Sequence, residues 1–173
     1  MEVKNLTFAM IKPDAVAQKD SGKIIDMIEK NGFEIVRLHK AIVAKDLAEE
    51  FYAEHKEKPF FNELVEFVIS NPVLIMALYK ENAINEWRQL IGATNPKDAA
   101  PGTIRHAFGT DIGKNAVHGS LDSESAVREL ELFFPEMFGF LENDLSAEAL
   151  AEEDKSCGCD ENCCDCDDDS CNG

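Results

Sequence analysis

LTFAMI, residues 6–11, is a short apolar run with aromatic and β-favouring members, and Lys12-Pro13 closes it. A run of this length and composition predicts a buried strand, and the Lys-Pro pair is typical of the turn that ends one. A second run, VLIMALYK at residues 73–80, predicts another strand that is buried on both faces. Both runs therefore predict β-structure inside a core.

Weaker patterns predict the remaining elements. Residues 33–43 alternate in character and predict one more strand, and the short run 116–118 predicts a fourth. Ser21, Asp46 and Ser123 are the expected N-caps of helices. Helical spacing covers residues 23–30, 46–54, 60–70, 82–92 and 124–134. Residues 92–114 are rich in Gly, Pro, Thr and Asn and predict a long ordered loop of a length that is usually functional.

The order of these elements is strand, helix, strand, helices, strand, helix, strand, helix. This order predicts the α/β class in its α+β form: a ferredoxin-like split βαβ fold with a four-stranded, mostly antiparallel sheet. Helices pack on this sheet, and we expect the crossovers to cover one face. A small doubly wound sheet is the alternative, which the few strands and the short middle helices disfavour.

Composition limits the domain organisation and the location. The chain has 173 residues, of which 45% are apolar, and this is enough for the core of one domain. We expect a compact domain at residues 1–151 and an acidic, Cys-rich tail at residues 152–173. No apolar run approaches the roughly 20 residues that span a bilayer, and no signal peptide is recognisable, so we expect a cytoplasmic protein without a membrane partner.

The charge distribution bears on the class of partner. The formal net charge is −17, and residues 152–173 contain nine acidic residues and one basic residue. Because both parts of the chain are acidic, a specific nucleic-acid partner is not expected, since neutralising phosphates needs a basic surface. A small nucleotide remains a possible ligand if a few Lys and Arg side chains converge locally.

The six cysteines all lie in the tail, so they cannot form a disulfide framework for the compact domain. They occur in C-x-C and C-C patterns with acidic residues between them. Dense thiolates suit soft ions such as Zn²⁺ or Cu(I), so one interpretation is a metal site. The other is a disordered, solubilising tail. The candidate thiols are Cys157, Cys159, Cys163, Cys164, Cys166 and Cys171.

Several polar residues lie at the ends of predicted elements rather than on their faces. Together they offer fixed positive charge, forked donors and neutral hydrogen bonds, which are the groups that bind a polyphosphate. They are Lys12, Arg88, Thr94, Arg105 and Asn115. The patterns GxxxxGK[ST] and GxGxxG are absent, so a nucleotide would bind without a strand–loop–helix cradle.

His118 lies at the end of the fourth predicted strand and is followed by Gly119. A neutral imidazole has a lone pair at neutral pH, and a phosphorylated intermediate would split one transfer into two steps. A partner must then hold the ring in one tautomer, and Glu129 on the last helix is a candidate. The alternative is a core histidine whose hydrogen bonds are satisfied.

Three motifs resemble the nucleoside diphosphate kinases in sequence, order and spacing: KPDAV at 12–16, GATNPKDAAPGTIR at 92–105 and NAVHGS at 115–120. The resemblance extends over roughly residues 4–140. It implies Mg²⁺-dependent, ping-pong transfer of the γ-phosphate of ATP or another nucleoside triphosphate to a nucleoside diphosphate. It also implies a homo-oligomer, either a tetramer or a hexamer.

The resemblance assigns roles to individual residues. His118 is the residue phosphorylated on Nδ1, Glu129 orients its ring, and Ser120 supports Glu129. Lys12 and Tyr52 complete the catalytic set. Phe60 is the aromatic residue that stacks on the base, and Ile112 lies on the other face of the base. The phosphate and ribose contacts are Lys12, Arg88, Thr94, Arg105 and Asn115.

One position departs from the family pattern. The family commonly has HGSDS where this chain has HGSLDS, and the spacing from His118 to Glu129 favours a substitution over an insertion. Leu121 cannot bind the water shell of the metal, so Asp122 is the expected metal contact through water. We therefore expect altered Mg²⁺ dependence with catalysis retained. Two other functions stay open: a catalytically altered nucleotide-binding or regulatory protein, and a metal-binding role for the tail.

Overall fold

The computed structural model describes residues 5–138, and residues 1–4 and 139–173 lie outside this part. The predicted boundary near residue 151 and the six tail thiols fall outside the described residues, so they stay predictions. The elements are β1 Leu6–Ile11, α1 Pro13–Ala17, α2 Ser21–Lys30, β2 Glu34–Ala41, α3 Lys45–Phe51, the 3₁₀ turn η2 Ala53–His55, α4 Phe61–Ile69, β3 Val73–Tyr79, α5 Ala83–Ile91, α6 Ile104–Phe108, β4 Val117–Gly119 and α7 Ser123–Phe133.

The sheet has the strand order β2-β3-β1-β4, and every neighbouring pair is antiparallel. β1 and β2 therefore run in the same direction with β3 between them, which is the split βαβ arrangement. The predicted four-stranded fold is confirmed. In the register, Phe8 lies opposite Ala77 and Met10 lies opposite His118. The pairing of β1 with β4 therefore fixes His118 on the edge strand β4, directly beside the inner strand β1.

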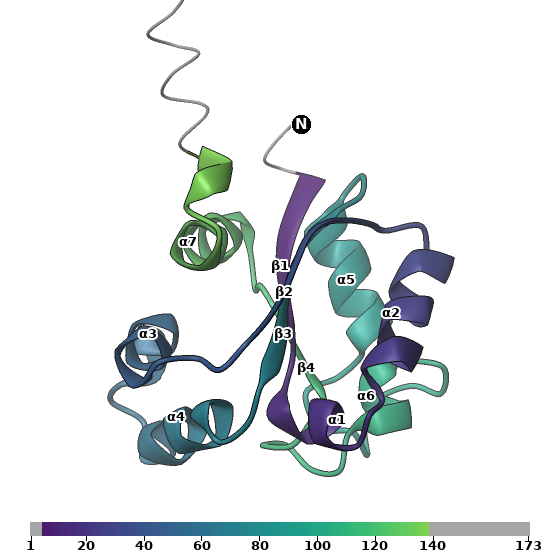
Figure 1. Cartoon of the computed structure of the whole chain (residues 1–173). Helices are drawn as coiled ribbons and strands as arrows, with labels where there is room; N and C mark the ends of the chain where they lie inside the picture. Colours follow the sequence, from purple (N-terminus) through teal and green to yellow (C-terminus); the bar gives the residue numbers. More distant parts are fainter. Residues whose placement is uncertain (1–4, 139–173) are drawn as a thin grey trace, which may run out of the picture. The chain divides into compact units, whose positions relative to one another are not determined.

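Helices cover both faces of the sheet, whereas the sequence led us to expect one. In Figure 1, α3, α4 and α7 lie on one side, and α1, α2, α5 and α6 lie on the other. The physical reason is that β1 is buried along its whole length, so its alternating side chains enter two cores. Phe8 and Met10 belong to the core under α3, α4 and α7, and Ala9 and Ile11 belong to the opposite one.

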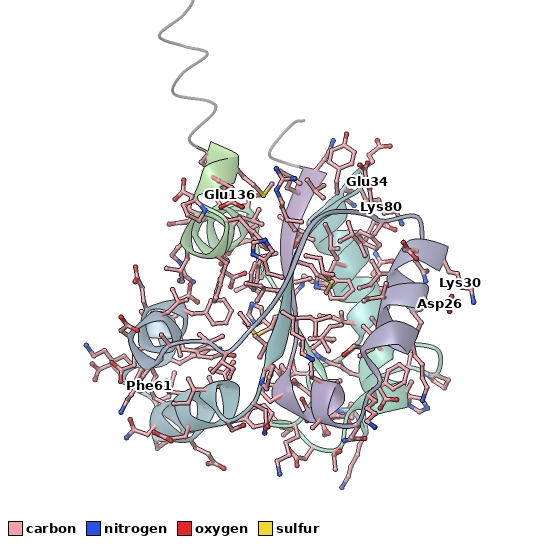
Figure 2. All side chains as sticks on the ribbon, in the orientation of Figure 1. Asp26, Lys30, Glu34, Phe61, Lys80 and Glu136 are labelled. Carbon is pink, nitrogen blue, oxygen red and sulfur yellow. The ribbon has the colours of Figure 1, made fainter. Side chains whose placement is uncertain are left out.

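Side chains fill the space between these layers, while charged groups lie around the outside (Figure 2). On the outer face of α2, Lys30 Nζ lies 2.7 Å from Asp26 Oδ2 in an exposed ion pair. The edge strand β2 carries the exposed Leu38. Of the helices between residues 5 and 138, none is long and apolar enough to cross a membrane.

The helix starts differ from the expected caps by one or two residues. Asp20 is at the N-cap of α2, and Ala44 is at the N-cap of α3. α7 is capped by Asp122 instead of Ser123, because its Oδ1 accepts the backbone N–H of Ser125 at 2.8 Å. Two short helices, α1 and α6, were not predicted, because five residues are too few to display a helical period.

Candidate active site

His118 lies on β4, with its ring directed into the core under α3 and α7. The ring contacts Phe51 with a centroid distance of 4.9 Å and Phe8 at 6.0 Å, both edge to face. The side chain keeps 22% of its surface exposed. These aromatic contacts fix the plane of the ring, and the exposed fraction leaves one edge accessible to a ligand.

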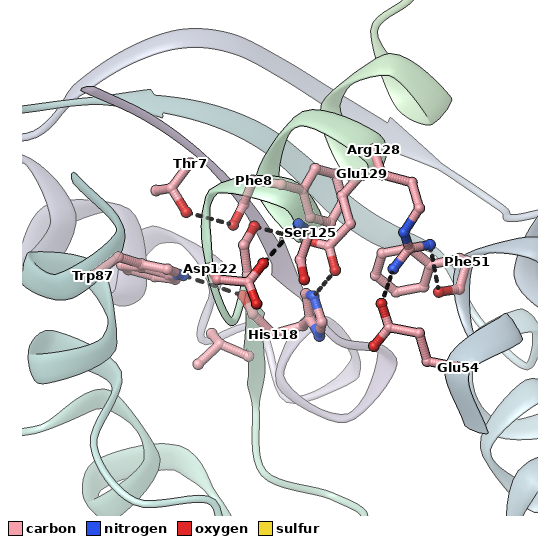
Figure 3. A network of polar contacts seen from close by, with 12 residues as sticks. Thr7, Phe8, Phe51, Glu54, Trp87, His118, Asp122, Ser125, Arg128 and Glu129 are labelled. Atoms are coloured by element: carbon pink, nitrogen blue, oxygen red, sulfur yellow. Dashed lines mark hydrogen bonds and ion pairs between the residues drawn. The ribbon is translucent and has the colours of Figure 1, made fainter. Parts of the chain in front are cut away.

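Glu129 on α7 holds the ring of His118 by a contact with its Nε2 atom. Its Oε1 lies 3.0 Å from His118 Nε2, and its Oε2 accepts the hydroxyl of Ser120 at 2.7 Å (Figure 3). The carboxylate is 4% exposed, so its charge is buried, and both oxygens have partners. Because an ionised carboxylate only accepts, Nε2 carries the proton and the lone pair lies on Nδ1. The described residues offer no hydrogen-bond partner to that Nδ1.

Trp87 fixes the backbone next to His118. Its indole Nε1 donates to the carbonyl oxygen of His118 at 3.3 Å, and its ring is fully buried. Gly119 packs so closely that a Cβ added there would overlap Nε1 and Cδ1 of the indole. Gly119 therefore permits the close approach of β4 to α5, and this approach fixes the position of the His118 backbone relative to α5.

We predict that Gly119→Ala lowers the free energy of unfolding by about 1–3 kcal/mol, because the buried indole has no space into which to move. Urea denaturation measures this change. Gly22→Ala in α2 is the matched control, since a Cβ there meets nothing within 4 Å. If Gly119→Ala unfolds at the same urea concentration as Gly22→Ala, the close approach of Trp87 does not constrain this position.

A second group of site residues gathers around Lys12. Lys12 Nζ donates to Asn115 Oδ1 at 2.8 Å, and Asn115 Nδ2 donates to the carbonyl oxygen of Thr94 at 3.0 Å. Burial, followed by the charge of Arg105, lowers the pKa of Lys12 to about 8. A buried ammonium with a cationic neighbour and a neutral acceptor attracts an anion, which would relieve the repulsion.

Arg105 on α6 supplies this cationic neighbour. Its Nη1 and Nη2 donate to the carbonyl oxygens of Gly92 and Val117 at 2.9 and 3.2 Å, and its buried Nε has no partner among residues 5–138. Burial and the charge of Arg88 lower the pKa of Arg105 to about 10. Since carbonyl groups satisfy the guanidinium without neutralising it, Arg105 keeps its positive charge next to Lys12.

The turn that joins these groups is locally strained. Ala116 has φ of +68°, an uncommon value for a residue with a Cβ. Its N–H donates to Asp14 Oδ2 at 3.0 Å, and its carbonyl accepts the N–H of Lys12 at 2.8 Å. Asp14, which follows Lys12-Pro13, therefore holds the backbone segment that carries both Asn115 and His118.

An aromatic series leads from the histidine to the surface. Tyr52 lies next to Phe51, its hydroxyl has no partner in the described part, and burial and the charge of Glu129 raise its pKa. The rings of Tyr52 and His55 are 6.4 Å apart, and those of His55 and Phe60 are 5.9 Å apart. Phe60 is 49% exposed, which suits a flat ligand stacking on it.

The structure distributes the predicted residues over this site in different ways. It joins His118, Glu129 and Ser120 in one network and Lys12, Asn115 and Thr94 in another. Arg88 and Ile112 are exposed, and no contact of their side chains with either network is recorded in residues 5–138 beyond the charge of Arg88 on Arg105. Phe51 and His55 were missed, although His55 lies one helical turn after Tyr52, which is the signal that could have indicated it.

A magnesium ion fits this site only as a companion of a bound phosphate. Within residues 5–138, no three His, Cys, Asp or Glu side chains are grouped to hold a metal. Asp122 is exposed, the bond from Ser125 lowers its pKa, and only one carboxylate oxygen is used in that bond. In proteins, Mg²⁺ is commonly held by one or two carboxylates together with substrate phosphates and waters. The single carboxylate of Asp122 fits this kind of site, which does not need a full set of protein ligands.

Comparisons with known proteins agree with this geometry. The family model described as nucleoside diphosphate kinase matches residues 5–138. The chain is 53% identical to the nucleoside diphosphate kinase of Geotalea uraniireducens (strain Rf4), over 76% of this chain and 96% of that protein. It is 49% identical to that of Archaeoglobus fulgidus, over 74% of this chain and 85% of that protein.

Two solved structures are similar in fold. The nucleoside diphosphate kinase of Aquifex aeolicus superposes with a TM-score of 0.74 at 44% identity, covering 75% of this chain and 94% of that one. The halophilic nucleoside diphosphate kinase of Halobacterium salinarum, solved in complex with CDP, superposes with a TM-score of 0.73 at 44% identity. It covers 76% of this chain and 88% of its own.

Proposed function

Since the chain belongs to the nucleoside diphosphate kinase family and transfers phosphate from a nucleoside triphosphate to a nucleoside diphosphate, we propose that the phosphoryl group passes through His118. One observation carries this proposal. Glu129 occupies Nε2 of the ring at 3.0 Å, which leaves the lone pair of Nδ1 for the substrate. A histidine that served only packing would not need a buried carboxylate to set its tautomer.

The proposed reaction has two steps. In the first, the Nδ1 lone pair forms a bond to the γ-phosphorus while the bond from that phosphorus to the bridging oxygen breaks. The nucleoside diphosphate leaves with the electron pair of that bond. In the second, a β-phosphate oxygen of another nucleoside diphosphate bonds to the phosphorus, and the N–P electron pair returns to Nδ1. The Nε2 proton stays in place throughout, and Glu129 stabilises positive charge on the ring.

The cations and the exposed aromatic residue support nucleotide binding. Lys12, Arg88 and Arg105 provide positive charge for the phosphates, which phosphoryl transfer requires. Phe60 offers a stacking surface, and stacking contributes about 1–3 kcal/mol for any base. The Halobacterium relative was solved with CDP, which agrees with a site that accepts more than adenine nucleotides.

We predict that the affinity for ADP falls as pH rises through about 8, the pKa of Lys12 in the free protein. The protonated ammonium binds phosphate and predominates below this pH, so affinity is nearly constant near pH 7 and drops about tenfold by pH 9. Titration calorimetry in buffers of different ionisation enthalpy measures both the affinity and the proton taken up. Lys12→Arg should flatten this profile, and a flat profile for the unaltered protein would contradict the assignment.

Mg²⁺ would bind together with the phosphates of the substrate, and there it would neutralise charge on the phosphate oxygens. Asp122 would meet its water shell with the oxygen not engaged by Ser125. Leu121 is 62% exposed and offers no polar atom, so altered dependence on Mg²⁺ remains our prediction for this chain.

The test is direct. Incubation with γ-labelled ATP should leave acid-labile label on the protein, and adding unlabelled GDP should remove it as labelled GTP. Initial rates of GTP formation with ATP varied at several fixed GDP concentrations should give the parallel reciprocal plots of a ping-pong reaction. Transfer without any labelled protein, or with intersecting plots, would exclude the phosphohistidine route while leaving the family assignment intact.

Three further expectations remain predictions. Leu38 on the edge strand β2 is 44% exposed, and Ile42 directly after this strand is 69% exposed. These exposed apolar side chains support the expected homo-oligomer, and a mass measurement in solution would test its size. A cytoplasmic location and metal binding by the tail thiols stay predictions from the sequence. The intact pairing of His118 with Glu129 favours an active enzyme over the regulatory alternative.

A further inference from the structure

We define the helical arm as residues 45–69, which include α3, η2 and α4. Several aromatic side chains beside His118 belong to this arm. Phe51 touches the histidine ring, Tyr52 follows it, and Phe60 lies at the far end of the aromatic series. The position of the arm therefore decides where these rings meet a nucleotide.

Apolar packing anchors the two ends of the arm but not its middle. Ala48 and Phe51 in α3 and Val65 and Val68 in α4 are buried in the core. Between them, nearly every residue from 53 to 60 is exposed. A hollow of about 470 Å³ also lies between this middle part and α7. Packing alone therefore does not set the position of the segment that runs from Ala53 to Phe60.

Arg128 spans this gap. Its Nη2 lies 2.7 Å from Glu54 Oε1, and its Nη1 donates to the carbonyl oxygen of Phe51 at 3.5 Å (Figure 3). Apart from bonds to the flanking residues 44 and 70, these are the hydrogen bonds that join the arm to the rest of residues 5–138. Both come from one side chain.

Arg128 is also the neighbour of Glu129 in α7. Figure 3 shows the two side chains leaving the same helix, Glu129 toward His118 and Arg128 toward the arm. One helix thus fixes the histidine ring and the arm that faces it. No other polar contact in the described region connects these two parts of the site.

We propose that Arg128 is a positioning residue for nucleotide binding, because its bonds to Glu54 and Phe51 hold the exposed middle of the arm, which ends at Phe60, where it meets the nucleotide. This inference rests on the proposed function of the site. It concerns nucleotide binding rather than the nucleophile, since both oxygens of Glu129 are already engaged by His118 and Ser120.

The variants Arg128→Gln and Glu54→Gln test this inference. Because the pair is partly exposed, its loss should weaken ADP binding about two- to fivefold, with kcat nearly unchanged. The effect of Arg128→Gln should at least equal that of Glu54→Gln, since Arg128 also bonds to Phe51. The double variant should not exceed Arg128→Gln, because both substitutions remove the same ion pair.

The chain offers a matched control in α3. Lys45 Nζ lies 3.9 Å from Glu49 Oε1, and this exposed pair does not leave the arm. Glu49→Gln removes the same charge from the same arm as Glu54→Gln and should leave ADP affinity unchanged. Raising the salt concentration should weaken ADP binding more in the unaltered protein than in Arg128→Gln, and Arg128→Lys should restore part of the affinity.

Other outcomes would overturn the inference. Unchanged ADP affinity in Arg128→Gln would do so, as would an equal loss in Glu49→Gln. A fall in kcat at constant affinity would show that Arg128 acts through Glu129 instead of the arm. Calorimetry with ADP does not depend on the phosphohistidine, and labelling of Arg128→Gln with γ-labelled ATP tests that intermediate separately. Failure of the proposed function is therefore distinguishable from failure of this inference.

Discussion

Replacing His118 by alanine is expected to lower kcat for phosphoryl transfer by at least about 10⁴-fold, because the variant lacks the atom that accepts the phosphoryl group. Direct transfer between two bound nucleotides would need both substrates in one site, and a single set of cations around Lys12 and Arg105 serves that site. The rate of GTP formation from ATP and GDP measures the loss. ADP affinity should change little, since Nδ1 reacts with the γ-phosphate, which ADP lacks.

The chain has four histidines, which provides a control for this result. His39 on β2 is exposed and packs on Phe134 with a centroid distance of 5.3 Å, away from the site network. His39→Gln should keep both the rate and the acid-labile label. If His118→Ala still became labelled at the normal rate, another residue would be the phosphate carrier.

Much of the fold was predictable from local patterns, because each strand has a distinct apolar or alternating run. The strand over residues 6–11 has the expected bounds. Coverage of both sheet faces was not predicted, since a run of apolar residues is compatible with one core or two. The register that sets Met10 opposite His118 depends on pairing between distant segments, which local periodicity does not contain.

For the candidate site, the identity of residues was predictable from sequence, whereas their contacts were not. The residues that the family motifs mark could be named from sequence. Their contacts could not, since Lys12 and Asn115 are 103 positions apart and meet only through the β1–β4 pairing. Arg128 and His55 lay in no motif that we used. Their positions became informative only when the arm and α7 were seen to face each other.

The Leu121 substitution shows what spacing alone can decide. Leu121 lies in the loop between β4 and α7, where an inserted residue could be accommodated without rotating the helix, so the evidence for a substitution is the family-like spacing from His118 to Glu129. The 3.0 Å contact from Glu129 to His118 agrees with a substitution in an unchanged register. The sequence did not indicate that Asp122 would cap α7, because Ser123 is an equally common capping residue.

Substitutions at Glu129 separate ring orientation from nucleotide binding. Glu129→Ala removes the acceptor of the Nε2 proton, frees the ring to change tautomer and leaves Ser120 without its partner. We expect a fall of about 10²–10⁴-fold in the rate of His118 phosphorylation. Glu129→Gln keeps the shape but loses the charge that stabilises the ring in transfer, so a fall of about 10–100-fold is expected. Rapid-quench measurement of labelled protein in a single turnover gives both rates.

The neighbouring hydroxyl supplies the comparison that makes this result specific. Ser120→Ala removes one of the two bonds to the same carboxylate and leaves the contact with His118, so its effect should be smaller than that of either Glu129 variant. ADP affinity should be similar in all three variants, because the cations around Lys12 are unaltered. A loss of affinity that parallels the loss of rate would mean that Glu129 supports the whole pocket, and its role in orienting the nucleophile would then have to be abandoned.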